Sequence, residues 1–228
     1  MYYGNLKWFR FSRTQMKGDS MRRSLAVMVF TVLFLSGLSA QSSGGAVIQL
    51  GDAINNKTVT LTVAGNGGSS GFAVEGSLKN NTGNTININV GIEKGMYLKN
   101  SGSGQNMIAI QIFQLDADYY SDGNNNYITV PAQAAVKIVL NAFCANYNLD
   151  NPSSDESFSV SPIPAAIAGI ASTISKYAAN NFDSDDDYTA AMQLAVWRTQ
   201  GNTRAEISDK FDFTDADWDL STTIMNSR

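Results

Sequence analysis

One cysteine and one glutamine stand out as residues that together could form a reactive bond. Cys144 is the only cysteine of the chain and ends a segment of alternating apolar residues. Gln193 is the one polar side chain in the apolar run 190–197, which predicts a buried helix. A glutamine amide taken out of water costs about 1–3 kcal/mol if its groups stay unpaired. Gln193 therefore needs a partner.

The bond that these two side chains could form is a thioester. Attack of the Cys144 sulfur on the side-chain carbonyl of Gln193 expels ammonia and leaves a stored electrophile. Well-aligned groups can reach effective molarities on the order of 10⁵ M or more, so proximity supplies the step. The bond lasts only where apolar walls exclude water, until a target amine or hydroxyl displaces the sulfur. Trp197 lies one helical turn after Gln193 and could cover the bond.

Each residue also has an ordinary explanation, which the sequence leaves open. A free cysteine is often a small buried hydrophobic residue. A buried glutamine often pairs with backbone groups where a helix meets a sheet. The chain has no histidine, which excludes Ser-His-Asp and Cys-His catalysis and histidine-ligated zinc. Without an evident base for Cys144, a turnover enzyme is not expected.

The segments that would position the pair change their period along the chain. Residues 44–160 alternate apolar and polar positions, with breaks rich in glycine and asparagine. This pattern predicts half-buried antiparallel strands and a β-sandwich of immunoglobulin-like character. In the last strong strand, 134–144, the inward-facing row ends at Cys144.

Helical periodicity follows the strands. Ile163, Ile167, Ile170, Ile174 and Tyr177 form one apolar stripe. Farther on, residues 203–206 (Thr-Arg-Ala-Glu) match a capping box. Strands followed by helices predict an α+β fold, in which a β-sandwich part (41–160) packs with a small helical subdomain (161–228) as one unit.

The first forty residues are expected to lie outside this fold. Residues 21–40 predict a secretory signal peptide, and residues 1–20 a non-native N-terminal extension. These forty residues hold 6 of the 16 basic and 1 of the 20 acidic side chains, so the remainder has a net charge of −9. An acidic exported chain argues against nucleic-acid binding and against membrane insertion after signal removal. We expect a secreted or cell-envelope protein, extracellular or periplasmic.

Two acidic segments raise the question of calcium, although neither matches the EF-hand spacing. They contain Asp116, Asp118 and Asp122, and Asp183, Asp185, Asp186 and Asp187. A hairpin tip and a helix N-terminus explain them equally well. We therefore expect no metal and no cofactor.

The cysteine and glutamine motifs resemble those of bacterial thioester domains, the covalent-adhesin modules of cell-surface proteins. Phe143 stands directly before Cys144, and residues 193–197 (Gln-Leu-Ala-Val-Trp) match the Gln-x-Ala-aliphatic-Trp helix of that family. Met192 stands where the family usually has threonine. The resemblance implies that Cys144 and Gln193 are the bond partners, with Phe143 and Trp197 as shielding residues. It also implies a β-rich part combined with a helical part.

Two hypotheses follow from the sequence. In the first, the chain captures a protein or glycan nucleophile, an amine or a hydroxyl, through a Cys144–Gln193 thioester, as a single covalent event in adhesion. In the second, the chain is a non-covalent interaction or structural module of the envelope, with an inert buried cysteine.

Overall fold

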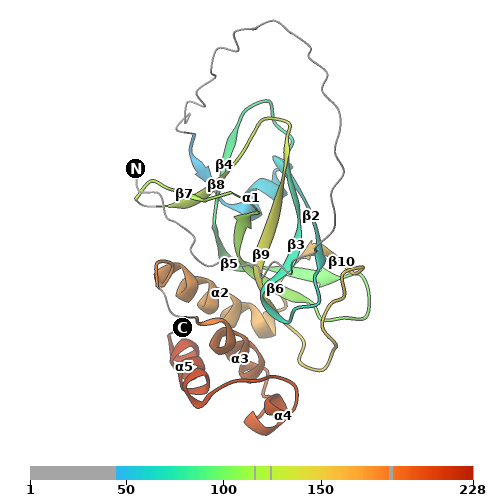
Figure 1. Cartoon of the computed structure of the whole chain (residues 1–228), viewed down its shortest axis with the longest axis vertical. Helices are drawn as coiled ribbons and strands as arrows, with labels where there is room; N and C mark the ends of the chain where they lie inside the picture. Colours follow the sequence, from blue (N-terminus) through green and yellow to red (C-terminus); the bar gives the residue numbers. More distant parts are fainter. Residues whose placement is uncertain (1–44, 116, 124, 185–186, 228) are drawn as a thin grey trace, which may run out of the picture. The chain divides into compact units, whose positions relative to one another are not determined.

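Six antiparallel strands close into a barrel in the order β10-β2-β3-β9-β6-β5 (Figure 1). The strands are β2 (Val59–Gly65), β3 (Ser70–Asn80), β5 (Gly91–Asn100), β6 (Met107–Gln114), β9 (Ala135–Cys144) and β10 (Ser157–Ser161). Strand β9 lies between β3 and β6, so both of its edges are paired over most of its length. Pairing on both edges fixes the position of the last residue of β9, Cys144.

The predicted β-sandwich was wrong, because one short strand closes the sheet on itself. Phe158 of β10 lies opposite Val63 of β2 on one side and opposite Asn100 of β5 on the other. A sandwich has two separate sheets. Here β10 pairs with β2 along one edge and with β5 along the other, which closes a single sheet into a barrel. Alternating apolar and polar residues suit both architectures, so the pattern did not distinguish them.

A smaller sheet and a short helix complete the β-rich part. The sheet has the order β1-β4-β8-β7. Its strands are β1 (Val47–Ile48), β4 (Ile86–Asn89), β7 (Tyr120–Ser121) and β8 (Asn126–Val130), and α1 (Leu50–Asn55) follows β1. Leu50 and Ala53 bury one side of α1.

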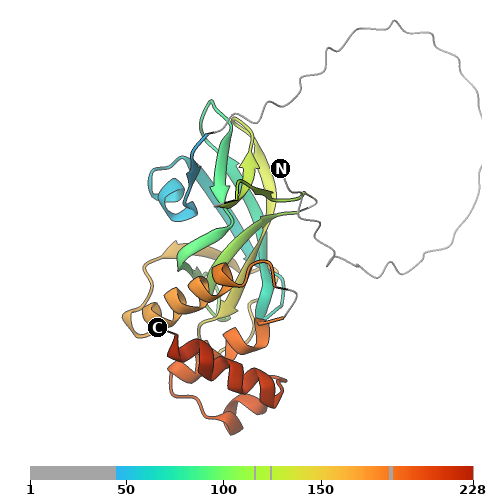
Figure 2. The same cartoon turned by 90° about the vertical axis from the view of Figure 1, so that its left-hand side faces the viewer.

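Four helices lie together at one end of the barrel (Figures 1 and 2). They are α2 (Ala165–Asn180), α3 (Thr189–Thr199), α4 (Arg204–Ser208) and α5 (Asp215–Asn226). Helix α2 packs on β5 and β6, while α3 packs on α5 and reaches β9 and β3. One cluster of buried apolar side chains runs from the barrel strands into α2 and α3. The helical part is therefore joined to the barrel through a common core.

The predicted capping box at the start of α4 is confirmed. The Thr203 side chain accepts from the Glu206 backbone, and the Glu206 side chain accepts from the Thr203 backbone. The same reciprocal arrangement at Thr214 and Asp217 begins α5. Local sequence alone thus sets where these two helices begin.

The structure is a computed structural model that describes residues 45–227 apart from 116, 124, 185 and 186. The described residues belong to one compact unit. The predicted N-terminal extension (1–20) and signal peptide (21–40) lie outside the described residues. No helix among the described residues is both long and apolar enough to span a membrane.

Glu156 ties together two loops at the helical end of the barrel. Its carboxylate accepts hydrogen bonds from the backbone of Ser103 (2.9 Å), Gly104 (3.0 Å) and Ser153 (3.0 Å), and from the Asn100 side chain (3.0 Å). A Cβ atom on Gly104 would lie 2.3 Å from the carboxylate, so the loop needs glycine to come this close. These hydrogen bonds, with the Gly104 backbone first, lower the pKa of Glu156.

Glu156→Gln is expected to lower the thermal midpoint of unfolding, because an amide nitrogen cannot accept these bonds. The folded-state pKa of Glu156 lies below its usual value of 4.5. Its stabilising contribution is therefore complete above that value and is lost as the pH falls through the folded-state pKa. Thermal unfolding of both proteins from pH 7 to pH 3 should show a gap at pH 7 that narrows below pH 4.5.

The matched control for this change is Asp155→Asn, which removes a neighbouring charge and leaves the bonds to Ser103 and Gly104 in place. An equal loss of stability in the control, or a gap that stays constant with pH, would contradict the role given to Glu156.

Candidate functional site

Cys144 ends β9 at the helical end of the barrel and is fully buried. Met107 of β6 lies opposite Cys144 in the ladder, and its sulfur is 3.6 Å from Cys144 Sγ. The backbone N–H of Cys144 donates to Ser69 O at 3.0 Å, in the segment just before β3. The prediction that this strand ends with a buried cysteine is confirmed, and Phe143 on the other face of the strand is buried as well.

Gln193 is fully buried in the middle of α3, where every side chain from Ala191 to Trp197 is buried. Its amide pairs with the backbone of Cys144 on both sides. Gln193 Oε1 accepts from Cys144 N at 2.8 Å, and Gln193 Nε2 donates to Cys144 O at 3.0 Å. The structure thus brings together the two residues singled out in the sequence, 49 positions apart in the chain. The partners that the buried amide requires are the backbone N–H and C=O of Cys144.

Burial controls the protonation of the thiol. Desolvation raises the pKa of Cys144 to about 12, because the apolar surroundings disfavour a thiolate. At neutral pH the sulfur is therefore a thiol. A turnover nucleophile is activated by a lowered pKa or an adjacent base, and the surroundings of Cys144 shift its pKa in the opposite direction.

The hydrogen bond to Gln193 Oε1 has a chemical consequence for the amide carbon. A backbone N–H that points at a carbonyl oxygen stabilises the negative charge that develops there when a nucleophile adds. The bond from Cys144 N is 2.8 Å long, and both side chains are fully buried. The arrangement is that of one oxyanion-stabilising donor already in place on Gln193.

The two shielding residues expected from the sequence are both buried, but in different surroundings. Phe143 is fully buried in β9, opposite Ser70 of β3 and Ile108 of β6. Trp197 is 3% exposed, and its ring meets two other aromatic rings edge to face.

The two rings that contact Trp197 were not expected from the sequence. Tyr147 and Phe211 each have their ring centroid 5.5 Å from that of Trp197. Tyr147 stands between Asn146 and Asn148, shortly after β9, and an aromatic residue between two asparagines is the one signal that could have singled it out. The Tyr147 hydroxyl donates to Glu206 O, which ties this stretch to α4.

The structure describes four of the seven aspartates in the two acidic segments, namely Asp118, Asp122, Asp183 and Asp187. Asp116, Asp185 and Asp186 lie outside the described residues. Within the described part of the chain, no three or more Cys, Asp or Glu side chains gather as a metal site would require.

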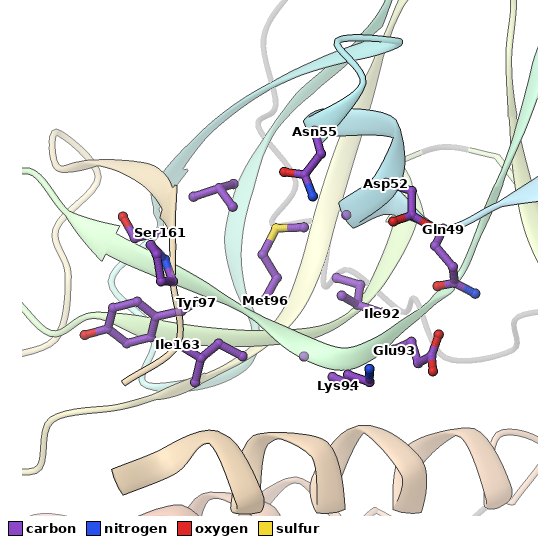
Figure 3. Close-up of a pocket in the computed structure, with 14 residues that line it drawn as sticks. Gln49, Asp52, Asn55, Ile92, Glu93, Lys94, Met96, Tyr97, Ser161 and Ile163 are labelled. Atoms are coloured by element: carbon purple, nitrogen blue, oxygen red, sulfur yellow. The ribbon is translucent and has the colours of Figure 1, made fainter. Parts of the chain in front are cut away.

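A separate cavity of about 490 Å³ lies between α1, β5 and the chain around the end of β10 (Figure 3). Met96 and Ile92 of β5 and Asp52 of α1 line it. Lys94, also in the lining, has a φ of 64°, and β5 loses its regular register with β6 there. Neither Cys144 nor Gln193 lines this cavity. We refer to it as the α1 cavity.

The pairing between the Gln193 amide and the Cys144 backbone is expected to stabilise the fold whether or not a covalent bond forms. In a Cys144→Ala background, which has no sulfur, adding Gln193→Leu should lower the free energy of unfolding by about 1–3 kcal/mol. Leucine keeps the bulk but leaves Cys144 O without its donor. Urea denaturation of the single and double variants measures the difference.

Gln200→Leu in the same background is the matched control, because Gln200 is exposed at the end of α3 and donates only to Val196 O of its own helix. A change at Gln193 no larger than that at Gln200 would show that the buried pairing contributes nothing.

Comparison of the chain with models of protein families, with curated proteins and with solved structures found no match. The site therefore stands on its own geometry: a buried thiol and a buried carboxamide, joined through the backbone of Cys144 at the junction of barrel and helices.

Proposed function

We propose that the protein is an exported, bacterial thioester protein that captures a surface or matrix ligand covalently through a Cys144–Gln193 bond. One observation carries the proposal: the fully buried Gln193 amide receives a 2.8 Å hydrogen bond from the backbone of the only cysteine. The motifs around both residues resemble those of bacterial thioester domains. The secreted or cell-envelope location belongs to the same proposal and follows from the predicted signal peptide.

Formation of the bond balances without an external reagent. Cys144 Sγ adds to Cδ of Gln193, and the negative charge on Oε1 is stabilised by Cys144 N–H. The carbon–nitrogen bond then breaks, the thiol proton passes to the departing nitrogen, and ammonia leaves. Because the pKa of Cys144 is raised to about 12, addition and proton transfer must be closely coupled rather than start from a stable thiolate.

Loss of ammonia also prepares the site for the ligand. Nε2 was the donor to Cys144 O, so this carbonyl becomes available to an incoming N–H or O–H group. Attack of that amine or hydroxyl on Cδ releases Cys144 as a thiol and leaves an amide or ester on the former glutamine. Each molecule acts once, because nothing in this sequence of steps restores the thioester; this is binding and not turnover.

A second candidate function is favoured by the completeness of the amide pairing. Both polar groups of Gln193 already have backbone partners, which is a full explanation for a buried glutamine. In that case the chain is a non-covalent interaction or structural module of the envelope, and Cys144 is an inert buried thiol.

Intact mass of the purified chain is expected to fall below the sequence mass by one ammonia. Cys144→Ala and Gln193→Ala should each restore the full mass, because each removes one partner of the bond. Treatment with methylamine should then add one methylamine to the wild-type protein and nothing to either variant.

Gln200→Ala is the control, since it removes a glutamine of the same helix and should leave the deficit intact. A thioester already hydrolysed would convert the Gln193 side chain to a carboxylate, which peptide mapping detects. Full mass together with an unchanged Gln193 would establish the second candidate instead.

A further inference from the structure

Four aromatic side chains from separate segments of the chain form one cluster. They are Phe72 of β3, Phe113 of β6, Tyr119 directly before β7 and Phe182 shortly after α2. Phe113 is the central ring, and its centroid lies 5.6 Å from that of Phe72, 6.5 Å from that of Tyr119 and 6.2 Å from that of Phe182. The rings of Tyr119 and Phe182 meet edge to face at 5.0 Å. We call these four side chains the aromatic cluster.

The aromatic cluster is open to solvent at Phe72. Strand β3 loses its regular register with β9 between Gly71 and Val74, and Phe72, which lies in this bulge, is 42% exposed. A bulge commonly turns a side chain away from the regular face of a sheet. The other three rings are half-buried. Apolar surface with a polar rim is typical of an interaction site, and the rim of this cluster is charged.

The two acidic segments of the sequence meet at the aromatic cluster. Asp118 directly precedes Tyr119 and Asp183 directly follows Phe182, so the contact between the two rings brings these segments together. The β7–β8 hairpin and the end of α2 lie on the same side of the molecule in both views (Figures 1 and 2). Burial raises the pKa of Tyr119, and the charges of Asp183 and Asp118 raise it further. Both carboxylates therefore lie within electrostatic reach of the cluster.

The chemistry of this surface selects a cation. The faces of aromatic rings carry partial negative charge and attract ammonium and guanidinium groups. The nearby carboxylates add to this attraction, and neither acidic segment contains a lysine or an arginine. Nucleic acids and anionic lipids would be repelled by the same charges.

Other rings of the protein have a cation from the chain itself. The Arg198 guanidinium lies 3.9 Å from the centroid of the Trp218 ring, and Lys210 Nζ lies 5.0 Å from that of Tyr147. Within the described part of the chain, no lysine or arginine lies in this way over the three half-buried rings of the cluster. No described lysine or arginine forms an ion pair with the two flanking aspartates. A cation at this surface therefore has to come from a partner molecule.

We infer that the aromatic cluster docks a basic segment of a partner protein, with a lysine or arginine side chain over the rings. Charge complementarity carries the inference, because ring faces and carboxylates on this surface match a side chain that is both apolar along its stem and cationic at its end. A metal ion fits less well. Ring faces provide no oxygen ligands, and no three acidic side chains gather among the described residues. The docking is non-covalent and does not depend on the proposed thioester.

The test measures fluorescence anisotropy of short labelled peptides mixed with the purified chain. The peptides consist of glycine and serine and carry arginines, lysines or glutamines at the same positions. At least one of the two basic peptides should bind saturably, and its affinity should fall as salt is added, because salt screens exposed charges. The glutamine peptide should not bind. Failure of both basic peptides to bind, or equal binding of the glutamine peptide, overturns the inference.

Phe72→Ala is expected to weaken the affinity for the basic peptide about threefold, the effect of losing one exposed cation–π contact. Leu149→Ala is the matched control, because Leu149 is 40% exposed but lies outside the cluster. An unchanged affinity in Phe72→Ala, or an equal loss in Leu149→Ala, would show that the rings do not take part.

The double variant Asp118→Asn with Asp183→Asn tests the charges and keeps the inference testable if Phe72→Ala does not fold. It should weaken binding about fivefold and make the affinity less dependent on salt. Asp212→Asn, at an exposed aspartate outside the two acidic segments, is the control. Equal affinities of the double variant and the wild type would overturn the inference.

Two further measurements separate this inference from its competitors. Displacement of the peptide by calcium, together with full peptide affinity in Phe72→Ala, would assign the acidic segments to a metal and overturn the docking. Cys144→Ala cannot form a thioester and should still bind the basic peptide. Peptide binding by a wild-type chain that shows no mass deficit would retain the docking and reject the thioester, and a mass deficit without peptide binding would do the reverse.

Discussion

A buried amide links helix α3 to the barrel by polar pairing, beside the apolar core that the two parts share. Gln193 lies in the middle of a helix with apolar neighbours, and within the described part of the chain its amide pairs with the backbone at the end of β9. Leaving a buried amide without partners costs a sizeable fraction of the free energy of unfolding of a domain. The position of α3 against the barrel is therefore fixed by polar pairing as well as by apolar packing.

This constraint works only because β9 is held on both edges. The ladders to β3 and β6 run along most of the strand and end near Cys144. At that last residue the backbone has groups to spare: the N–H is shared between Ser69 O and Gln193 Oε1, and the C=O accepts from Gln193 Nε2. The end of a central strand thus offers a donor and an acceptor that a carboxamide can meet at once.

In the proposed reaction, the same geometry serves stability and reactivity, and the two compete. As long as the amide is intact, both of its groups stabilise the junction. Condensation with Cys144 removes the nitrogen and with it the donor to Cys144 O, so some stability is exchanged for a reactive bond. A pair that stays inert and a pair that forms a thioester therefore start from the same hydrogen-bonded arrangement. The two differ only in whether Cδ of Gln193 is bonded to nitrogen or to sulfur.

The sequence predicted the features that depend on local pattern. The alternation that ends at Cys144, the buried helix around Gln193 and the capping box at Thr203 each need only a few neighbouring residues, and each is present. The barrel was missed because closure depends on β10, five residues whose pairing with β2 and β5 is wholly non-local. The rings of Tyr147 and Phe211 around Trp197 were missed for a similar reason, since both contacts join separate segments of the chain.

The loops beside the end of β9 are held in place at several points. Glu156 holds the loop before Gln105 and the segment after Asp150 through four hydrogen bonds. On the opposite side, Tyr147 is tied to α4 through its hydroxyl. The loop that Glu156 holds continues into Asn106, whose carbonyl accepts from the backbone N–H of Ala145, the residue after Cys144. The carboxylate of Glu156 thus supports the end of β9, where Gln193 pairs with the backbone of Cys144.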